Sequence, residues 1–411
     1  MIEKYLQKNP IAYVTRDKER ATGLQEIEGQ YLILTNASQP TATHTLLTEQ
    51  DIEEIINTNS ANIVVFKNTS IIERICREHH WNLLNPSASL AQEIEDKISQ
   101  VHWLNELAQY LPKYFISDCA DIDFDGTPFI LQFNRAHTGS GTYFINTKKQ
   151  LDELKKQFPD RPAKISQYIT GPVLTCNVVV TTTDILFGNI SYQITGLEPF
   201  TQNPFATIGN DWNVANTILS SSKLASPTHD KETKKEKILE IGKKIGKKMQ
   251  SQGWIGLFGI DIIIDEKTDT VYLLEINARQ PASTTFESFL QRKGLEAHAA
   301  GSDKNITTFD AHLTSLLKKD VDQNIIPITH GAQILLRNTE QLLQLDPEAF
   351  NTLVNNIKKL NYTVTVYPDN DKMDADKIRI QSTESFISHH NELNEAGKQL
   401  AQIILQSYES N

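Results

Sequence analysis

One stretch of the chain, residues 253–283, constrains the fold more than any other part of the sequence. It reads GWIGLFGIDIIIDEKTDTVYLLEINARQPAS, and its two apolar runs, GIDIII and VYLLEI, have the composition of β-strands. The short polar link between them is typical of a hairpin turn. If Asp265 pairs with Val271, the register places Asp261 directly opposite Glu275.

Three oxygen-bearing side chains then share one face of this hairpin. Asn277 is two residues beyond Glu275, so it points to the same side as Glu275 and Asp261. Two opposed carboxylates repel each other, and burying them without a partner is costly. A divalent cation removes that conflict, and an all-oxygen donor set suits Mg²⁺. The opposite face carries the aliphatic side chains of Ile260, Ile262, Leu274 and Ile276.

Arg279 follows Asn277 by two residues and points the same way if the strand continues. Its guanidinium would then suit a phosphate or acyl-phosphate oxygen. The alternative interpretation is a hairpin whose charges simply face water. The shared strand phase of G-x-D and E-x-N-x-R favours the site over that alternative.

The first ninety residues predict a parallel α/β unit. Capping boxes that begin at Thr48 and Ser70 predict helices between apolar runs. Strand–helix–strand order is typical of a parallel sheet covered by helices. The runs that we predict as strands are 11–15, 31–36, 62–67 and 81–84.

The rest of the chain predicts mixed α and β structure. A helical stretch covers about 88–109, and the asparagine- and glycine-rich segment 197–213 predicts a long loop, which we interpret as a functional lid. Residues 231–250 are rich in lysine but have a helical apolar stripe, in which Gly242 and Gly246 would allow close packing on a sheet. Strand-like runs predicted after the first ninety residues include 128–133, 142–145, 164–169 and 175–180, and the tail from 325 adds a further α+β pattern.

We therefore predict an α/β fold with four regions. They are an N-terminal α/β domain at 1–90, a small lobe with a glycine-rich loop at 91–180, a large lobe with the metal site at 181–324, and a small C-terminal α+β unit at 325–411.

Composition restricts the function classes. The formal net charge of −11 argues against a nucleic-acid partner. The three cysteines form no C-x-x-C pair, and the sequence has neither a signal peptide nor a membrane-length apolar run. We therefore expect a cytoplasmic protein without membrane contact. An exposed hairpin in the last ninety residues is a candidate surface for homodimer formation.

The G-x-D strand followed by E-x-N-x-R resembles the signature of the ATP-grasp superfamily, and the chain looks similar to its carboxylate–amine ligases. The resemblance extends from about Pro86 to Ser283 and implies an ATP-grasp fold preceded by the family's usual α/β (pre-ATP-grasp) domain. It implies ATP as cofactor and one or two Mg²⁺ ions, with Mn²⁺ as the alternative. The implied metal ligands are Asp261, Glu275 and Asn277, with Asn277 and Arg279 as catalytic residues.

Other positions match the family less completely. Lys97 is similar to the first phosphate lysine, and the glycine-bearing turn at 135–142 to the loop that covers the phosphates. ISQYITGP, residues 165–172, is similar to the hinge that meets the adenine edge. The residues that the resemblance assigns to nucleotide binding are Lys97, Gln132, His137, Thr138, Gly139, Ser140, Gly141, Thr142, Gln167, Tyr168 and Ile169.

Three departures weaken the match. Gln132 stands where the family has its second phosphate lysine, Ser166 at the adenine-side acid and Val173 at the ribose-side acid. Each replacement removes a charge or a charge-assisted hydrogen bond. His137 and Arg135 are the candidate substitutes for the missing cation.

The resemblance implies a small-molecule carboxylate and an amine as substrates. ATP would phosphorylate the carboxylate to an acyl phosphate, which the amine then attacks. Glu198 is a candidate to orient the amine, and Thr284 and Thr285 are candidates to bind the carboxylate. Two alternatives stay open, another ATP-grasp phosphotransferase or carboxylase, and a non-catalytic nucleotide-binding regulatory protein.

Overall fold

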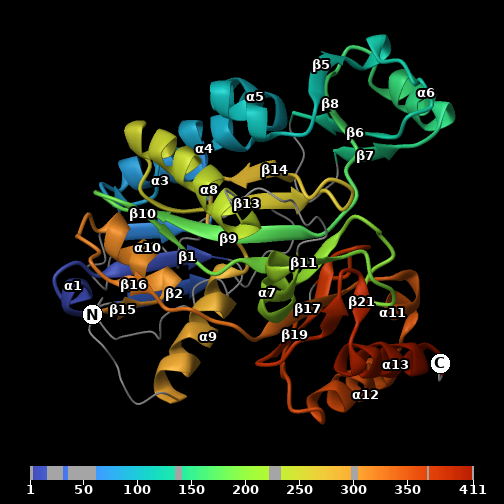
Figure 1. Ribbon diagram of the computed structural model, residues 1–411. Coiled ribbons are helices and arrows are strands. Elements are labelled where there is room, and N and C mark those ends of the chain that lie inside the picture. The colour runs from blue at the N-terminus through green and yellow to red at the C-terminus, as the bar shows by residue number, and fades with distance from the viewer. Residues whose placement is uncertain are drawn as a thin grey trace.

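A computed structural model of the protein describes residues 3–15, 31–35, 62–134, 141–221, 233–297, 304–367 and 370–409 (Figure 1). The described α-helices are α1 (Glu3–Leu6), α3 (Ser70–Glu78), α4 (Ala88–Glu95), α5 (Lys97–Leu104), α6 (Lys148–Gln157), α7 (Trp212–Ser220), α8 (Lys234–Ser251), α9 (Thr284–Ala297), α10 (Thr308–Leu316), α11 (Glu340–Gln344), α12 (Pro347–Lys358) and α13 (Glu395–Glu409). Short 3₁₀ helices cover Asn105–Tyr110 and Cys119–Asp121.

The N-terminal sheet is parallel, as its strand–helix–strand pattern predicts. Its strands lie in the order β2 (Tyr31–Thr35), β1 (Ile11–Thr15), β3 (Asn62–Val65) and β4 (Asn82–Leu83). The predicted capping box at Ser70 is wrong by one residue, because Thr69 is the N-cap and its hydroxyl accepts from the Ile72 amide. Glu73 instead accepts hydrogen bonds from Asn68 and from the Ala88 amide. The box predicted at Thr48 lies outside the described residues.

A large sheet forms the centre of the molecule. Within the described residues it has nine strands, and eight of them run in the order β14 (Val271–Asn277), β13 (Gly256–Ile264), β9 (Val173–Val180), β11 (Ser191–Thr195), β12 (Thr207–Asp211), β17 (Ala332–Arg337), β19 (Asp376–Ser382) and β18 (Thr363–Val366). The ninth strand, β10 (Ile185–Phe187), pairs with β9. The strands predicted in the C-terminal tail therefore extend the central sheet through β12 and β17. The boundaries of the four predicted regions stay predictions.

The interpretation of 197–213 as one long loop is wrong. Residues 207–211 form β12, which pairs with β11 on one side and β17 on the other, and α7 begins at Trp212. The sequence TIGND has little β-propensity, so the strand is imposed by its two neighbours. The backbones of β12 and β17 approach closely at Gly209, where a Cβ would lie 2.0 Å from the Gln333 carbonyl oxygen of β17.

The two faces of the central sheet are covered by different helices. Side chains on one face, such as Val178 and Val180, pack in one core with α8, while Val179 on the opposite face packs with α10. The lysine-rich helix α8 approaches closely, as predicted, because a Cβ at Gly242 or Gly246 would lie under 3 Å from side chains of β10. Helix α10 also buries Phe309, Leu313 and Leu316 against the N-terminal sheet, so it joins the two sheets.

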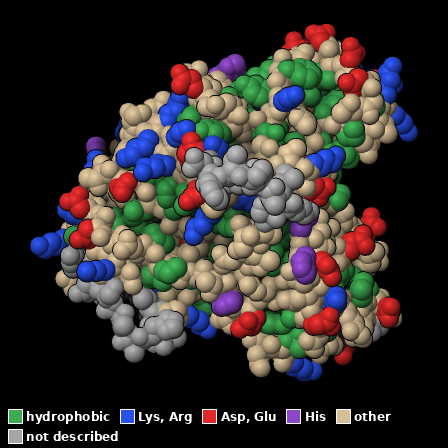
Figure 2. All heavy atoms as spheres, in the orientation of Figure 1, with side chains coloured by type: hydrophobic (Ala, Val, Ile, Leu, Met, Phe, Trp, Pro, Cys, Tyr) green, Lys and Arg blue, Asp and Glu red, His purple; other side chains and the backbone are tan. Residues whose placement is uncertain are grey.

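A separate antiparallel sheet forms the projecting lobe in the upper right of Figure 1. Its order is β5 (Tyr114–Asp118), β8 (Pro162–Gln167), β6 (Phe129–Phe133) and β7 (Thr142–Ile145), and α6 packs on it. Figure 2 shows the surface hollowed between this lobe and the body below it. Two small sheets complete the fold, one of β15 (Asn305–Ile306) with β16 (Asn324–Ile325), the other of β20 (Ile387–His389) with β21 (Glu392–Leu393).

The described part of the chain includes no helix with both the length and the apolar content needed to cross a bilayer. All three cysteines, Cys76, Cys119 and Cys176, are buried and unpaired. Burial raises the pKa of each thiol above its ordinary value, which keeps the thiols protonated at neutral pH.

Gly171 fixes the connection between the projecting lobe and the central sheet. Its φ is +145°, and a Cβ there would lie 2.0 Å from the Ile264 carbonyl oxygen at the end of β13. The neighbouring carbonyls of Thr170 and Pro172 accept hydrogen bonds from the amides of Glu266 and Ile264. Any side chain at Gly171 would therefore push this connection away from the hairpin.

We expect Gly171→Ala to lower the free energy of unfolding by about 3 kcal/mol, since backbone strain and overlap act together. Gly253→Ala is the matched control, because Gly253 also has positive φ (+85°) but no atom lies within 4 Å of the new Cβ. It should cost only about 1 kcal/mol. Urea unfolding of the two variants measures the difference, and equal losses would contradict this role of Gly171.

Candidate functional site

The predicted opposition of Asp261 and Glu275 is confirmed. The two residues pair across β13 and β14, and Asn277 pairs with Gly259 at the end of the hairpin. A register shift between Asp261 and Ile262 makes the turn differ from the prediction, because Ile264, not Asp265, pairs with Val271.

This bulge has a consequence for packing. Ile262 pairs with Leu273, so Leu274 is the extra residue of the bulged strand. Leu273 is fully buried in the core, whereas Leu274 is only partly buried. Leu274, which was predicted on the face opposite the carboxylates, is thus the less buried of the two leucines, and its face stays a prediction. On the Asp261 side of the bulge, the pairing of the two strands is the predicted one.

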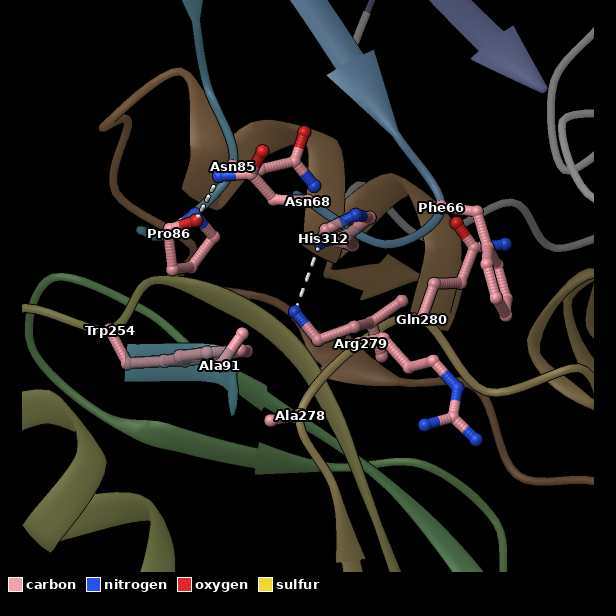
Figure 3. Close-up of a pocket in the computed structure, with 11 residues that line it drawn as sticks. Phe66, Asn68, Asn85, Pro86, Ala91, Trp254, Ala278, Arg279, Gln280 and His312 are labelled. Carbon is pink, nitrogen blue, oxygen red and sulfur yellow. Dashed lines mark hydrogen bonds between the residues drawn. The ribbon is translucent and has the colours of Figure 1, made fainter. Parts of the chain in front are cut away.

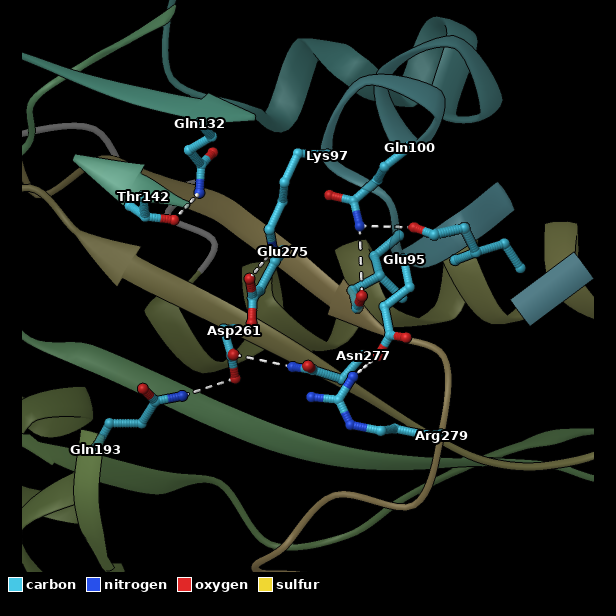
Figure 4. A network of polar contacts seen from close by, with 12 residues as sticks. Glu95, Lys97, Gln100, Gln132, Thr142, Gln193, Asp261, Glu275, Asn277 and Arg279 are labelled. Carbon is cyan, nitrogen blue, oxygen red and sulfur yellow. Dashed lines mark hydrogen bonds and ion pairs between the residues drawn. The ribbon is translucent and has the colours of Figure 1, made fainter. Parts of the chain in front are cut away.

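Asp261 is held by two amide side chains from different strands (Figure 4). Gln193 of β11 donates to its Oδ1 at 2.7 Å, and Asn277 donates to its Oδ2 at 3.0 Å. Burial raises the pKa of Asp261 to about 7, and the neighbouring charge of Glu275 adds to the effect. Gln193 was not predicted as a site residue, because only the sheet order, in which β9 alone separates β11 from the hairpin, brings its side chain to Asp261.

Glu275 is neutralised by a lysine. The ammonium group of Lys97 forms an ion pair with Oε2 of Glu275 (Figure 4). Burial alone would raise the pKa of Glu275, but the charge and hydrogen bond of Lys97 together with Asp261 and Lys164 outweigh it, so the pKa of this carboxyl lies below its ordinary value. Lys97, predicted from the sequence as a phosphate lysine, thus lies at the candidate metal ligands.

Lys97 is positioned by a cap from another element. It is the first residue of α5, and its N-cap residue, Asp96, makes no side-chain capping bond. Asn134, just after β6, does this instead, because its Oδ1 accepts from the Ile98 amide at 2.8 Å and from the Ser99 amide at 3.4 Å. The projecting lobe therefore fixes the start of the helix that carries Lys97.

A second charge cluster lies beside the first. Glu95, at the end of α4, forms ion pairs with Lys67 and with Arg279. The strand does not continue to Arg279, because β14 ends at Asn277 and the Arg279 amide donates back to the Asn277 carbonyl at 2.8 Å. The Arg279 guanidinium nevertheless lies close to the Asn277 side chain (Figure 4).

Arg279 also borders a small cavity between the N-terminal sheet and the central sheet (Figure 3). Asn68, Trp254 and His312 line this cavity as well. His312 accepts from the Leu257 amide through Nδ1, and burial lowers its pKa to about 3, so it is neutral at physiological pH. The cavity is therefore lined by apolar side chains and neutral polar groups, with Arg279 as its charged residue.

Lys164, which was not predicted from the sequence, lies near the carboxylate of Glu275 in addition to Lys97. Lys164 of β8 is 2% exposed and lies close enough to Glu275 to lower the pKa of that carboxyl. Burial, together with the like charge of Lys97, lowers the pKa of Lys164 to about 8. The available signal was a single lysine inside the strand-like run KISQYI.

Residues 94–283 match the family model described as the ATP-grasp domain. The chain carries an ATP-grasp domain. No curated protein sequence matches the chain.

Solved ATP-grasp structures share the fold over nearly the whole length of the chain. One is N5-carboxyaminoimidazole synthetase from Staphylococcus aureus complexed with ADP, with 15% identity, a TM-score of 0.63 and 97% of each chain covered. Another is N5-carboxyaminoimidazole synthase from Aspergillus clavatus in complex with ADP and 5-aminoimidazole ribonucleotide, with 14% identity, a TM-score of 0.61 and coverage of 98% and 99%.

A third similar structure is phosphoribosylamine–glycine ligase from Thermotoga maritima. Its identity is 13%, its TM-score is 0.58, and 97% of this chain and 96% of that chain are covered. At these identities the likeness establishes the fold alone.

The glycine-rich loop of the ATP-grasp domain is described only at its end. Four of the residues assigned to nucleotide binding, His137, Thr138, Gly139 and Ser140, lie outside the described residues, as does Arg135. The Gly141 carbonyl accepts from the Phe133 amide at 3.0 Å, which closes the β6–β7 hairpin. Gln132 donates to the exposed Thr142 hydroxyl at 3.3 Å, so the two assigned side chains lie together.

The assigned hinge residues lie at the end of β8 and just beyond it. The Gln167 amide donates to the Lys113 carbonyl at 2.8 Å, the Tyr168 ring contacts Phe144 in a tilted arrangement with centroids 4.5 Å apart, and Ile169 is buried. Ser166, at the adenine-side position, is buried, and its hydroxyl has no hydrogen-bond partner among the described residues. A neutral hydroxyl therefore stands where a carboxylate was expected, and Val173 begins β9.

The substrate-orienting candidates are placed differently from one another. Glu198 is exposed, and its peptide bond to Pro199 is cis. Thr284 is fully buried at the start of α9, and Thr285 is 9% exposed. The structure gives no contact that tests their predicted roles.

The residues at the hairpin fit a magnesium ion. Asp261 and Glu275 supply carboxylate oxygens, and the Asn277 side chain lies 3.0 Å from Asp261. No group of three or more His, Cys, Asp or Glu residues is poised for a metal in the described ranges. Two carboxylates and an amide suit Mg²⁺, which completes its coordination with water and phosphate oxygens.

We expect Asn134→Ala to weaken ATP binding about tenfold, because Lys97 loses the cap that fixes its helix. The free energy of unfolding should fall by about 1 kcal/mol. Ser87→Ala is the matched control, since Ser87 caps α4 through the Leu90 amide at 3.4 Å. Titration with ATP and Mg²⁺ separates the two variants, and equal affinities would contradict the positioning role of Asn134.

Proposed function

We propose that the protein is an ATP- and Mg²⁺-dependent ligase that joins a small-molecule carboxylate to an amine. The observation that carries the proposal is the register of β13 and β14. It places Asp261 opposite Glu275 with Asn277 beside them, inside an ATP-grasp domain. Lys97 and Lys164 lie close to Glu275, and Arg279 pairs with Glu95 nearby, which supplies the positive charge that the transfer of a phosphoryl group between anions requires.

The residues of the site divide this chemistry among them. Asp261, Glu275 and Asn277 would hold Mg²⁺, which when bound neutralises charge on the ATP phosphates. Lys97 orients the phosphates from the start of α5. Arg279 stabilises charge on the transferred phosphoryl group and on the acyl phosphate.

The reaction has two steps. A carboxylate oxygen attacks the γ-phosphorus, the bond to the β–γ bridging oxygen breaks, and ADP leaves with that electron pair. The amine nitrogen then attacks the acyl carbon, inorganic phosphate leaves, and the nitrogen loses a proton as the amide forms. The hollow between the projecting lobe and the body shields the acyl phosphate from water when the lobes close.

The similar structures support an amine as the acceptor. By their names, one is complexed with 5-aminoimidazole ribonucleotide and another is a phosphoribosylamine–glycine ligase. The first also supports a second candidate function, in which the amine receives a carboxy group instead of an organic acyl group. In that case bicarbonate takes the place of the organic carboxylate.

A non-catalytic role as a nucleotide-binding regulator has less support. It was suggested by the loss of family charges at Gln132, Ser166 and Val173. Lys164 supplies a positive charge beside Glu275, so the site does not lack cations.

The test measures ADP release with ATP and Mg²⁺ against a panel of carboxylates, each with and without amines. We expect release that requires both substrates, and hydroxylamine should trap the acyl phosphate as a hydroxamate. Release that requires bicarbonate and an amine, with no organic acid, would favour carboxylation. Release that needs no amine would contradict the ligase in favour of a phosphotransferase.

We expect Asp261→Asn and Arg279→Ala each to lower kcat by at least about 100-fold, because each removes charge stabilisation from the transition state. Asp322→Asn is the control, since Asp322 is exposed and lies outside the site. Circular dichroism checks that each variant is folded. Full activity in folded Asp261→Asn would rule out the metal-site assignment.

A further inference from the structure

Lys164 and Gln132 are direct neighbours across two antiparallel strands. The β6–β8 register pairs Gln132 with Lys164, between the pairs Leu131–Ile165 and Phe133–Ala163. All four of those flanking residues pack into the core of the projecting lobe. Because side chains alternate along a strand, Gln132 and Lys164 both point to the other face.

That other face looks toward the candidate metal site. The charge of Lys164 interacts with those of Glu275 of β14 and Lys97 of α5. Helix α5 packs against β6 and β8, which brings its first residue to this face. Positions 132 and 164 therefore point into one space with Lys97 and Glu275.

The burial of Lys164 needs an explanation. Its side chain is 2% exposed, and no hydrogen bond or ion pair joins its ammonium group to another described residue. Glu275, the carboxylate that it faces, already pairs with Lys97. A buried ammonium that shares its nearest carboxylate with a second lysine is costly, so a structural role in the chain alone does not account for it.

We propose that Lys164 binds the phosphates of ATP and replaces the lysine that ATP-grasp proteins carry at the position of Gln132. In this chain the lysine stands on β8, and Gln132 stands at the family's lysine position on the neighbouring strand β6. The amide of Gln132 donates to Thr142 at 3.3 Å, which holds it at the end of the glycine-rich turn. This assignment rests on the proposed function, because it requires ATP to bind at this site.

The exchange suggests a test in which the two side chains are swapped. Lys164→Gln should weaken ATP binding about tenfold to a hundredfold while AMP, which lacks the outer phosphates, binds as before. The double variant Lys164→Gln/Gln132→Lys should recover ATP affinity to within a few-fold of the wild-type value. The double variant places the lysine at position 132, which lies beside position 164 on the same face. Its long side chain then reaches the same phosphates.

Two controls separate phosphate binding from a structural role. Lys149→Gln removes an exposed lysine of the same lobe and should leave ATP affinity unchanged. The melting temperature of Lys164→Gln should not fall, because the change removes a buried charge. Titration calorimetry with ATP and AMP, together with thermal unfolding, gives both readouts.

The outcomes are distinct. An equal loss of ATP and AMP affinity in Lys164→Gln, or no recovery in the swapped variant, would overturn the assignment of Lys164 and leave the proposed function in place. A marked fall in the melting temperature would point to a structural lysine. A wild-type protein that binds neither nucleotide would contradict the proposed function itself.

Discussion

Asp261 and Glu275 lie opposite each other on adjacent strands, and in that position two like charges repel unless other groups compensate. The structure supplies the compensation from several elements, because Lys97 comes from α5, Lys164 from β8 and the amide of Gln193 from β11. Most of the polar organisation around the hairpin follows from this requirement. A magnesium ion with ATP phosphates would meet the same requirement, which is why a nucleotide site is the simplest account of the cluster.

The fold brings these groups together through three contacts between layers. Helix α10 joins the N-terminal sheet to the central sheet, and α8 covers the other face of the central sheet. The projecting lobe reaches the site through Asn134, which caps the helix of Lys97, and through the backbone around Gly171. The lobe thus contacts both the helix that carries Lys97 and the end of β13, so its movement would act on both elements.

Local sequence predicted the parts of the structure that depend on local periodicity. The parallel N-terminal strands, the apolar stripe of α8 and the phase of Asp261 with Glu275 were all predicted. The strand β12 was missed because TIGND has the composition of a loop and becomes a strand only between β11 and β17. The bulge at Leu274 was missed because a strand pattern does not reveal where one extra residue is inserted.

The sequence by itself identified Asp261, Glu275, Asn277 and Lys97 as candidate site residues and showed the resemblance to ATP-grasp ligases, since these depend on residue types at short spacings. Only the tertiary structure decided which other charges face them. Lys164 and Gln193 lie about 111 and 82 positions from Glu275 along the chain, and no local spacing connects them to it. Gln193 reaches the site because β9 alone separates β11 from β13 in the central sheet, and Lys164 reaches it from β8 in the separate sheet of the projecting lobe. Strand order and the packing of one sheet against another set these neighbours, whatever their separation in sequence.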